Sequence, residues 1–464
     1  MQTNFHHNYH QIQNPILREQ YRQLFEEELT PPPLTKRVLS SLASKKFLTL
    51  LTILIFLTIG IPLSLHLLKI STSKSKVLSA KIEVSHEIPT PYPPQIISPP
   101  STSSSLLNQT LTNVLTTNVV KKQIIGFLPY WLIKEEPSIK YNQLTQIAYF
   151  GVAFDGAGNV KAQNEDGTPD PGWLYLDKSE LNQIFQKAKQ AQTKTTLVLR
   201  IMDNDDIVSL VNDGIKRETF IRKALNLVRE KNFDSLNLDF EYAGTPPPVT
   251  IKNFTRLARE LKEALSRQNS SLVLTVDVFA DSAQNERLYD LKALKDIADY
   301  LVIMGYDIYR ANSEIAAPSA PLGPSHSYLT DYLQCLASFL KLVPPEKLIL
   351  AVPYYGYEWQ TTSVKKNAPT LKDTGALATY KRVKDVIDKK NPQVFWDDEG
   401  QTPWLTYQED GKINQIYFEN QRSLALKYDL VNELGLAGVA IWALGYDAPH
   451  PELWQLLQEK FPRI

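Results

Sequence analysis

One short stretch of this 464-residue chain places two carboxylates where they could carry out acid–base chemistry. Residues 234–241 read Asp-Ser-Leu-Asn-Leu-Asp-Phe-Glu, in which apolar side chains alternate with polar ones. Side chains on a β-strand alternate between its two faces, so Asn237, Asp239 and Glu241 share one face. Buried carboxylates must be hydrated or paired, and each raises the pKa of the other. The pattern therefore predicts a catalytic acid that stays protonated at neutral pH, rather than an edge strand with a solvated face.

Eight apolar segments could position this pair. They alternate with stretches of helical length, which predicts a parallel sheet, and eight such strands close a (β/α)8 or TIM barrel of the α/β class. The active site of such a barrel lies at the carboxyl ends of its strands, and Glu241 ends the fourth. An open doubly wound sheet is the alternative, but Pro129-Tyr-Trp131 follows the first strand where that fold would carry a glycine-rich loop. The predicted strands are 124–128, 146–154, 195–201, 235–241, 272–279, 300–305, 348–353 and 438–442, with helices at 178–191, 217–231, 250–267 and 328–342.

Aromatic and polar residues follow the other predicted strands. Met304-Gly-Tyr-Asp307 ends the sixth, a tyrosine-rich segment at 353–359 follows the seventh, and Trp442 ends the eighth. Tyrosine and tryptophan offer flat apolar faces with a polar tip, which suit the C–H faces of sugar rings. Gathered at one end of a barrel beside two carboxylates, these residues predict a sugar site. The candidate substrate-binding residues are Asn237, Met304, Asp307, Trp442, Tyr355 and Tyr130.

With these motifs the chain resembles glycoside hydrolase family 18, the chitinase family, over residues 121–460. The resemblance rests on the signature Asp-x-x-Asp-x-Asp-x-Glu, on Met-x-Tyr-Asp after the sixth strand, on Pro-x-Tyr-Gly after the seventh and on Gly-x-x-x-Trp in the eighth. Asn237 replaces the second Asp of the signature, as in the branch of spore-cortex lytic and chitobiase-like proteins. Two departures are Ser235, where Gly is usual, and Arg200-Ile-Met-Asp203, where Ser-x-Gly-Gly is common.

The resemblance implies a retaining glycosidase that hydrolyses β-1,4 bonds of N-acetylglucosamine-containing glycans, either peptidoglycan or chitin oligosaccharides, by substrate-assisted catalysis. Glu241 would be the acid and then the base, Asp239 would orient the acetamido group, Tyr306 would bind its carbonyl oxygen, and Trp442 would form the floor of the pocket. The resemblance implies no metal and no other cofactor. The alternative is a catalytically inactive, lectin-like member, although such proteins usually lose the Glu that this chain keeps.

Asn237 is the clearest departure from the chitinase pattern. Its amide cannot ionise, and we expect it to donate a hydrogen bond to Asp239 at any pH. Asp239 would then ionise more easily than as one of two carboxylates on the same strand. Its charge would in turn raise the pKa of Glu241 and keep that acid protonated.

The rest of the chain predicts a membrane anchor. The apolar run 47–68 matches the roughly 20 residues that span a bilayer, and it starts too late and runs too long for a cleaved signal peptide. We predict a polar cytoplasmic segment at 1–46, a single transmembrane helix at 47–68 and a disordered Ser/Thr/Pro-rich linker at 69–120. Lysines flank the run on both sides, so charge does not decide its orientation. We place the catalytic domain, 121–464, outside the cytoplasm, where such glycans lie.

Composition and length add three expectations. The 50 Lys and Arg residues balance the 50 Asp and Glu residues, which argues against a nucleic-acid partner. The single cysteine, Cys335, lies among apolar residues and is predicted to fill the core. Residues 360–430 are too long for a simple connection between the seventh and eighth strands, so we predict a small α+β insertion there. The sequence gives no sign of an obligate protein partner.

Overall fold

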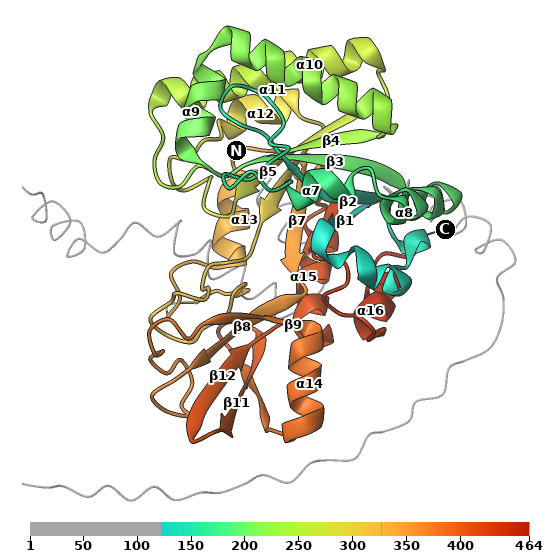
Figure 1. Ribbon diagram of the computed structural model, residues 1–464. Coiled ribbons are helices and arrows are strands. Elements are labelled where there is room, and N and C mark those ends of the chain that lie inside the picture. The colour runs from blue at the N-terminus through green and yellow to red at the C-terminus, as the bar shows by residue number, and fades with distance from the viewer. Residues whose placement is uncertain (1–121, 326, 464) are drawn as a thin grey trace, which may run out of the picture. The chain divides into compact units, whose positions relative to one another are not determined.

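The computed structural model describes residues 122–325 and 327–463, and within them eight parallel strands close into a barrel (Figure 1). Going round the barrel, the strand order is β1-β13-β7-β6-β5-β4-β3-β2. This arrangement confirms the predicted TIM barrel. The strands are β1 (Gln123–Pro129), β2 (Gln146–Ala153), β3 (Lys194–Ile201), β4 (Ser235–Phe240), β5 (Val273–Phe279), β6 (Tyr300–Met304), β7 (Leu348–Pro353) and β13 (Gly438–Trp442).

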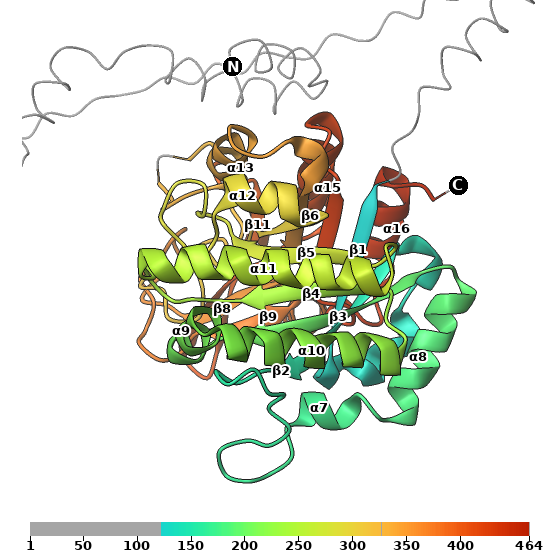
Figure 2. The same cartoon turned by 90° about the horizontal axis from the view of Figure 1, so that it is seen from above.

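Helices cover the outside of the barrel, as Figure 2 shows for the two long helices that run past β4. The four helices predicted from the sequence are α8, α10, α11 and α13, and Cys335 on α13 is buried as predicted. The α-helices outside the insertion are α7 (Pro171–Tyr175), α8 (Ser179–Gln190), α9 (Asn204–Asn212), α10 (Gly214–Lys231), α11 (Pro248–Gln268), α12 (Leu291–Ile297), α13 (Tyr332–Leu340), α15 (Gln421–Glu433) and α16 (Glu452–Lys460), with 3-10 turns η1 (Tyr130–Ser138), η2 (Tyr141–Gln143) and η3 (Pro345–Lys347).

The two faces of β4 have opposite environments. Its outward side chains, Leu236, Leu238 and Phe240, are fully buried under the helices. The Phe240 ring lies 5.7 Å from the ring of Phe220 on α10 and 5.6 Å from that of Phe254 on α11. Burying each such side chain contributes about 1.5–3 kcal/mol, which fixes the register of the strand. The polar side chains of β4 must therefore face the inside of the barrel.

An α+β insertion lies between β7 and β13, at the lower end of the molecule in Figure 1. Its antiparallel sheet has the order β10-β11-β12-β8-β9. The sheet begins at Tyr355, with only Tyr354 between it and the end of β7, and thus earlier than the predicted start at 360. The predicted end at 430 falls within α15, which contacts the barrel strands β7 and β13. The elements are β8 (Tyr355–Gln360), β9 (Ala376–Thr379), α14 (Tyr380–Lys390), β10 (Val394–Asp397), β11 (Thr402–Glu409) and β12 (Lys412–Tyr417).

The segments that precede the barrel fall outside the described residues. The predicted polar segment at 1–46, the predicted membrane helix at 47–68 and the predicted linker at 69–120 all lie there. Within 122–325 and 327–463, no helix combines the length and the apolar character that crossing a bilayer requires.

Candidate active site

A cavity of about 780 Å³ opens at the carboxyl ends of the barrel strands. Its volume falls in the range of about 300–1,000 Å³ that small-molecule sites occupy. Seven of the nine predicted site residues line it, whereas Asn237 and Tyr130 do not. The seven are Glu241, Asp239, Tyr306, Met304, Asp307, Trp442 and Tyr355.

Glu241 stands at the mouth of the barrel, directly after β4. Its backbone N–H donates to the carbonyl of Ile201 at 3.0 Å, so the strand pairing with β3 continues to this residue. Burial raises the pKa of the Glu241 carboxyl, the nearby Asp307 raises it further, and the positive charge of Arg310 opposes both. A raised pKa keeps a carboxyl protonated closer to neutral pH, as a general acid requires.

Asp307 is fixed by hydroxyl groups from two other segments. Its Oδ1 accepts hydrogen bonds from Tyr355 Oη at 2.5 Å, from Tyr357 Oη at 3.0 Å and from Ser319 Oγ at 3.3 Å. The residue has φ = +60°, in the left-handed region that Asp tolerates better than most residues. The hydrogen bonds hold the Asp307 carboxyl where its charge acts on Glu241.

Asp239 is more deeply buried, with 3% of its surface exposed, and its Oδ1 has no hydrogen-bond partner among the described residues. Burial raises the pKa of Asp239 well above its ordinary value, and Glu241 and Asp277 raise it further. The one opposing charge comes from Arg200, which lies over the ring of Phe150 at 5.6 Å. Asp239 is thus harder to ionise than an ordinary Asp, because burial and two neighbouring carboxyls outweigh one arginine. The expectation that it ionises more easily than it would with a second Asp on the same strand stays a prediction.

Asn237 binds a neighbouring strand and not Asp239. Its Nδ2 donates to Thr275 Oγ1 at 2.8 Å and to Asp277 Oδ1 at 2.6 Å, both on β5. The predicted hydrogen bond to Asp239 is absent among these contacts. The reason is geometric, since side chains two positions apart on one strand stand almost 7 Å apart, whereas neighbouring strands lie about 4.8 Å apart. Asn237 is 1% exposed and lies beneath the cleft.

Asp277 is a site residue that the sequence analysis missed. It is 4% exposed and lines the cleft next to the predicted carboxylates. The available signal was the run Leu-Thr-Val-Asp-Val at 274–278, which repeats on β5 the alternation of apolar and polar residues seen on β4. Only the barrel register brings the polar faces of the two strands together.

The aromatic part of the cleft is formed by Trp442 and two tyrosines. The Trp442 ring is half-buried and meets the ring of Phe150 edge-on at 4.8 Å. The Tyr306 ring lies 6.0 Å from that of Tyr355. Burial raises the pKa of the Tyr306 hydroxyl well above its ordinary value, and the charges of Asp277 and Asp307 raise it further. That hydroxyl therefore remains a hydrogen-bond donor at any working pH.

Tyr130 does not line the cleft. Its ring packs 6.2 Å from that of Tyr175 on α7. The next residue, Trp131, is 46% exposed and lies edge-on at 6.0 Å to Phe150, which lines the cleft. Consecutive side chains in a 3-10 turn point about a third of a turn apart, so only one of the two can face the cleft. The aromatic nearer the cleft is Trp131 and not the predicted Tyr130.

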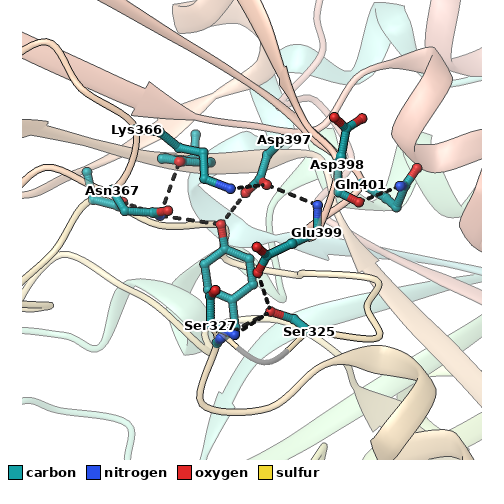
Figure 3. Close-up of polar contacts among 11 residues, drawn as sticks. Ser325, Ser327, Lys366, Asn367, Asp397, Asp398, Glu399 and Gln401 are labelled. Carbon is teal, nitrogen blue, oxygen red and sulfur yellow. Dashed lines mark hydrogen bonds and ion pairs between the residues drawn. The ribbon is translucent and has the colours of Figure 1, made fainter. Parts of the chain in front are cut away.

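A polar cluster ties one wall of the cleft to the insertion. Asp397 at the end of β10 is completely buried, accepts a hydrogen bond from the Tyr328 hydroxyl and pairs with Lys366 Nζ at 2.7 Å. Figure 3 shows Lys366 directed at Asp397. The loop that carries Tyr328 continues into Leu329 and Thr330, which line the cleft. The insertion therefore holds this wall in place.

Comparison with known proteins agrees with this geometry. Residues 123–447 match the family model described as glycosyl hydrolases family 18. The cortical fragment-lytic enzyme of Bacillus anthracis is 26% identical over 329 residues, which cover 68% of this chain and 68% of that protein. The di-N-acetylchitobiase of Rattus norvegicus is 25% identical over 242 residues, 49% of this chain and 64% of that protein. The solved structure of the Ostrinia furnacalis group IV chitinase with allosamidin superposes with a TM-score of 0.64 at 21% identity, over 74% of this chain and 98% of that one.

Proposed function

Because the chain belongs to family 18 of the glycosyl hydrolases, we propose that it is a membrane-anchored, retaining glycosidase that cleaves β-1,4 bonds of N-acetylglucosamine-containing glycans. The predicted likeness to the cortex-lytic and chitobiase members of the family is confirmed, as is the assignment to the glycoside hydrolases. The observation that carries the proposal is the cleft itself, in which Glu241, Asp239 and Tyr306 stand together beside Trp442.

In the proposed reaction the substrate supplies its own nucleophile. Glu241 donates its proton to the glycosidic oxygen, and the bond from that oxygen to the anomeric carbon breaks. The carbonyl oxygen of the 2-acetamido group forms the new bond to the same carbon and gives an oxazolinium ion. Asp239 accepts a hydrogen bond from the acetamido N–H and balances the positive charge of the oxazolinium ion. The Tyr306 hydroxyl donates a hydrogen bond to the acetamido oxygen. Water then attacks the anomeric carbon while the bond from that carbon to the acetamido oxygen breaks, which regenerates the acetamido group. The water gives a proton to Glu241, which restores the acid.

Arg310 bears on the choice between peptidoglycan and chitin oligosaccharides. This residue lines the cleft, is exposed, and acts with its positive charge on Glu241. A guanidinium binds carboxylates through two parallel hydrogen bonds. Peptidoglycan carries carboxylates on its peptides and on lactyl groups that bear no peptide, whereas chitin is neutral. Arg310 thus supports peptidoglycan as the substrate.

A lectin-like, inactive protein is the alternative, and product analysis separates the two functions. The full chain in detergent is incubated with chitin oligosaccharides and, separately, with peptidoglycan, and the products are identified by mass. We expect new reducing ends at N-acetylglucosamine residues, with peptidoglycan as the better substrate. Binding of both glycans without any product would show the lectin-like function instead.

The membrane proposal predicts one spanning helix at 47–68 with the barrel outside the cytoplasm. Protease added to intact spheroplasts is expected to cut within the linker at 69–120 and to release a fragment that contains the folded barrel. We expect this result because glycans of this kind lie outside the membrane, and because a linker rich in Ser, Thr and Pro is readily cut by protease. A cytoplasmic marker serves as the control for intact membranes. Complete protection of the chain, lost only on permeabilisation, would contradict this orientation.

A further inference from the structure

Asp277 is a buried carboxyl in the floor of the cleft that the reaction above does not use. β4 and β5 pair in parallel, with Asn237 beside Thr275 and Leu238 beside Val276. The next step of the same register sets Asp239 beside Asp277. Neighbouring strands lie about 4.8 Å apart, so two carboxyls meet side by side inside the barrel.

The surroundings of Asp277 are almost dry and contain more acids than bases. Its Oδ1 accepts the hydrogen bond from Asn237 at 2.6 Å, which fixes that oxygen as an acceptor. The other oxygen of the same carboxyl is free to carry a proton. The charged and titratable groups that face the Asp239–Asp277 pair are Glu241 after β4, Arg200 on β3, Tyr289 after β5, and Tyr306 and Asp307 after β6.

Two buried carboxyls side by side do not both ionise near neutral pH, because like charges in a dry site repel strongly. One cation, Arg200, acts on Asp239, and its guanidinium also lies 3.9 Å from the carboxylate of Asp170. One proton must therefore remain on the pair. The buried Oδ1 of Asp239 has no partner among the described residues, and a proton shared with Asp277 supplies one.

We propose that Asp277 is a positioning residue of the active site that shares one proton with Asp239 and thereby decides which of the two carboxyls carries the charge. The proposal rests on the glycosidase function proposed above. When the acetamido group binds, the proton resides on Asp277 and the charge on Asp239, where it faces the acetamido N–H and the oxazolinium ion. The proton moves within the pair, so no proton is gained or lost.

The electrostatics of the site agree with this arrangement. Burial, and then the charge of Glu241, raise the pKa of Asp277 to about 8, although the hydrogen bond from Asn237 opposes the shift. The titration belongs to the pair and not to either residue alone, since the two groups interact strongly.

An infrared titration of the full chain tests proton sharing without any substrate. In the difference spectrum between the wild type and Asp277→Asn, in which the other buried carboxyls cancel, one protonated carboxyl band should persist through neutral pH and disappear in a step near pH 8. In Asp277→Asn that step should be missing, because the variant has one carboxyl fewer at this place. A difference spectrum with no protonated carboxyl band at neutral pH, or a step near pH 8 that survives in Asp277→Asn, would overturn the proposal.

Two further variants separate proton sharing from a packing role, through the pH profile of kcat/KM. Asp277→Leu cannot donate to the charged Asp239, so the acidic limb should move to higher pH by about one unit, since a hydrogen bond to the charged form favours that form. The amide of Asp277→Asn can still donate, and should leave the acidic limb in place. Thr275→Val removes the other contact of the Asn237 amide and touches no carboxyl.

We expect Thr275→Val to leave the acidic limb where it is. Equal shifts in all three variants, or in none, would mean that Asp277 only holds Asn237, and would overturn the proposal. A wild-type chain that hydrolyses no N-acetylated glycan would refute the glycosidase function instead, while the infrared titration would still decide on proton sharing.

Discussion

Replacing Glu241 with Gln is expected to lower kcat on an unactivated N-acetylated glycan about 10²- to 10⁴-fold, the usual contribution of a general acid. Gln has the shape of Glu but holds no acidic proton, so the leaving oxygen must depart as an alkoxide. The fold should persist, because the backbone N–H of residue 241 still pairs with Ile201 on β3. Binding of oligosaccharide should also persist, since Tyr306 and Trp442 are unchanged.

The acidity of the leaving group determines how much a substrate depends on the Glu241 proton. A sugar with an acidic phenol as the leaving group needs little protonation, so its loss of rate in Glu241→Gln should be much smaller than that of the natural glycan. Glu263→Gln, the same substitution on the exposed side of α11, is the matched control and should leave both rates unchanged. Near-parental hydrolysis of the natural glycan by Glu241→Gln would show that another residue is the acid.

Much of the barrel could be predicted because each strand carries its own signal. Short apolar runs bounded by helical stretches depend on local patterning, and all eight predicted strands are found with ends that differ by at most one residue. The shared face of Asp239 and Glu241 could be predicted equally well, since alternation within one strand decides which side chains share a face. The insertion was predicted from its length and from a helix near 380–390 and strands near 402–407 and 415–419, which are found as α14, β11 and β12. Its start at Tyr355 was missed because β8 follows β7 after a single residue.

The errors in the site have one physical origin, since they concern contacts between segments far apart in the sequence. Asn237 bonds to β5 because the barrel register sets Thr275 and Asp277 beside it, and no pattern within β4 carries that information. For the same reason, the charge that raises the pKa of Glu241 comes from Asp307 after β6, which the sequence analysis took for a sugar ligand. The register between two strands is known only once the barrel has closed, whereas the alternation of residues within one strand is enough to tell which side chains share a face.

The second large effect is expected at a buried ion pair on the side of the barrel that carries the insertion. Lys427 on α15 donates to Glu419, which follows β12, at 2.7 Å, and the two side chains are 0% and 3% exposed. Burial lowers the pKa of Lys427 and raises that of Glu419, so each charge depends on the other for compensation. Lys427→Met should lower the free energy of unfolding by about 3–5 kcal/mol, the usual cost of leaving one buried charge without its partner.

The pH dependence of this loss identifies its cause. In Lys427→Met the Glu419 carboxyl stays buried without its cation, so its pKa in the folded state lies above that in the unfolded state. The folded state then binds a proton at Glu419 at pH values where the unfolded state has already lost it. The free energy of unfolding therefore falls as pH rises from the pKa of Glu419 in the unfolded state to its pKa in the folded state. The deficit of the variant should therefore shrink when unfolding is measured at acidic pH, and adding Glu419→Gln should recover part of it at neutral pH.

Lys460→Met provides the matched control, because Lys460 on α16 makes a pair of equal length, 2.7 Å, with Asp429 on α15. That pair is 22% and 27% exposed, so water can compensate the remaining charge and the loss should stay below about 1 kcal/mol. Denaturant titrations of the three variants at two pH values compare these losses directly. If Lys427→Met cost no more than Lys460→Met, or if its deficit were the same at both pH values, the buried pair would not hold α15 to the end of the insertion sheet through its charges.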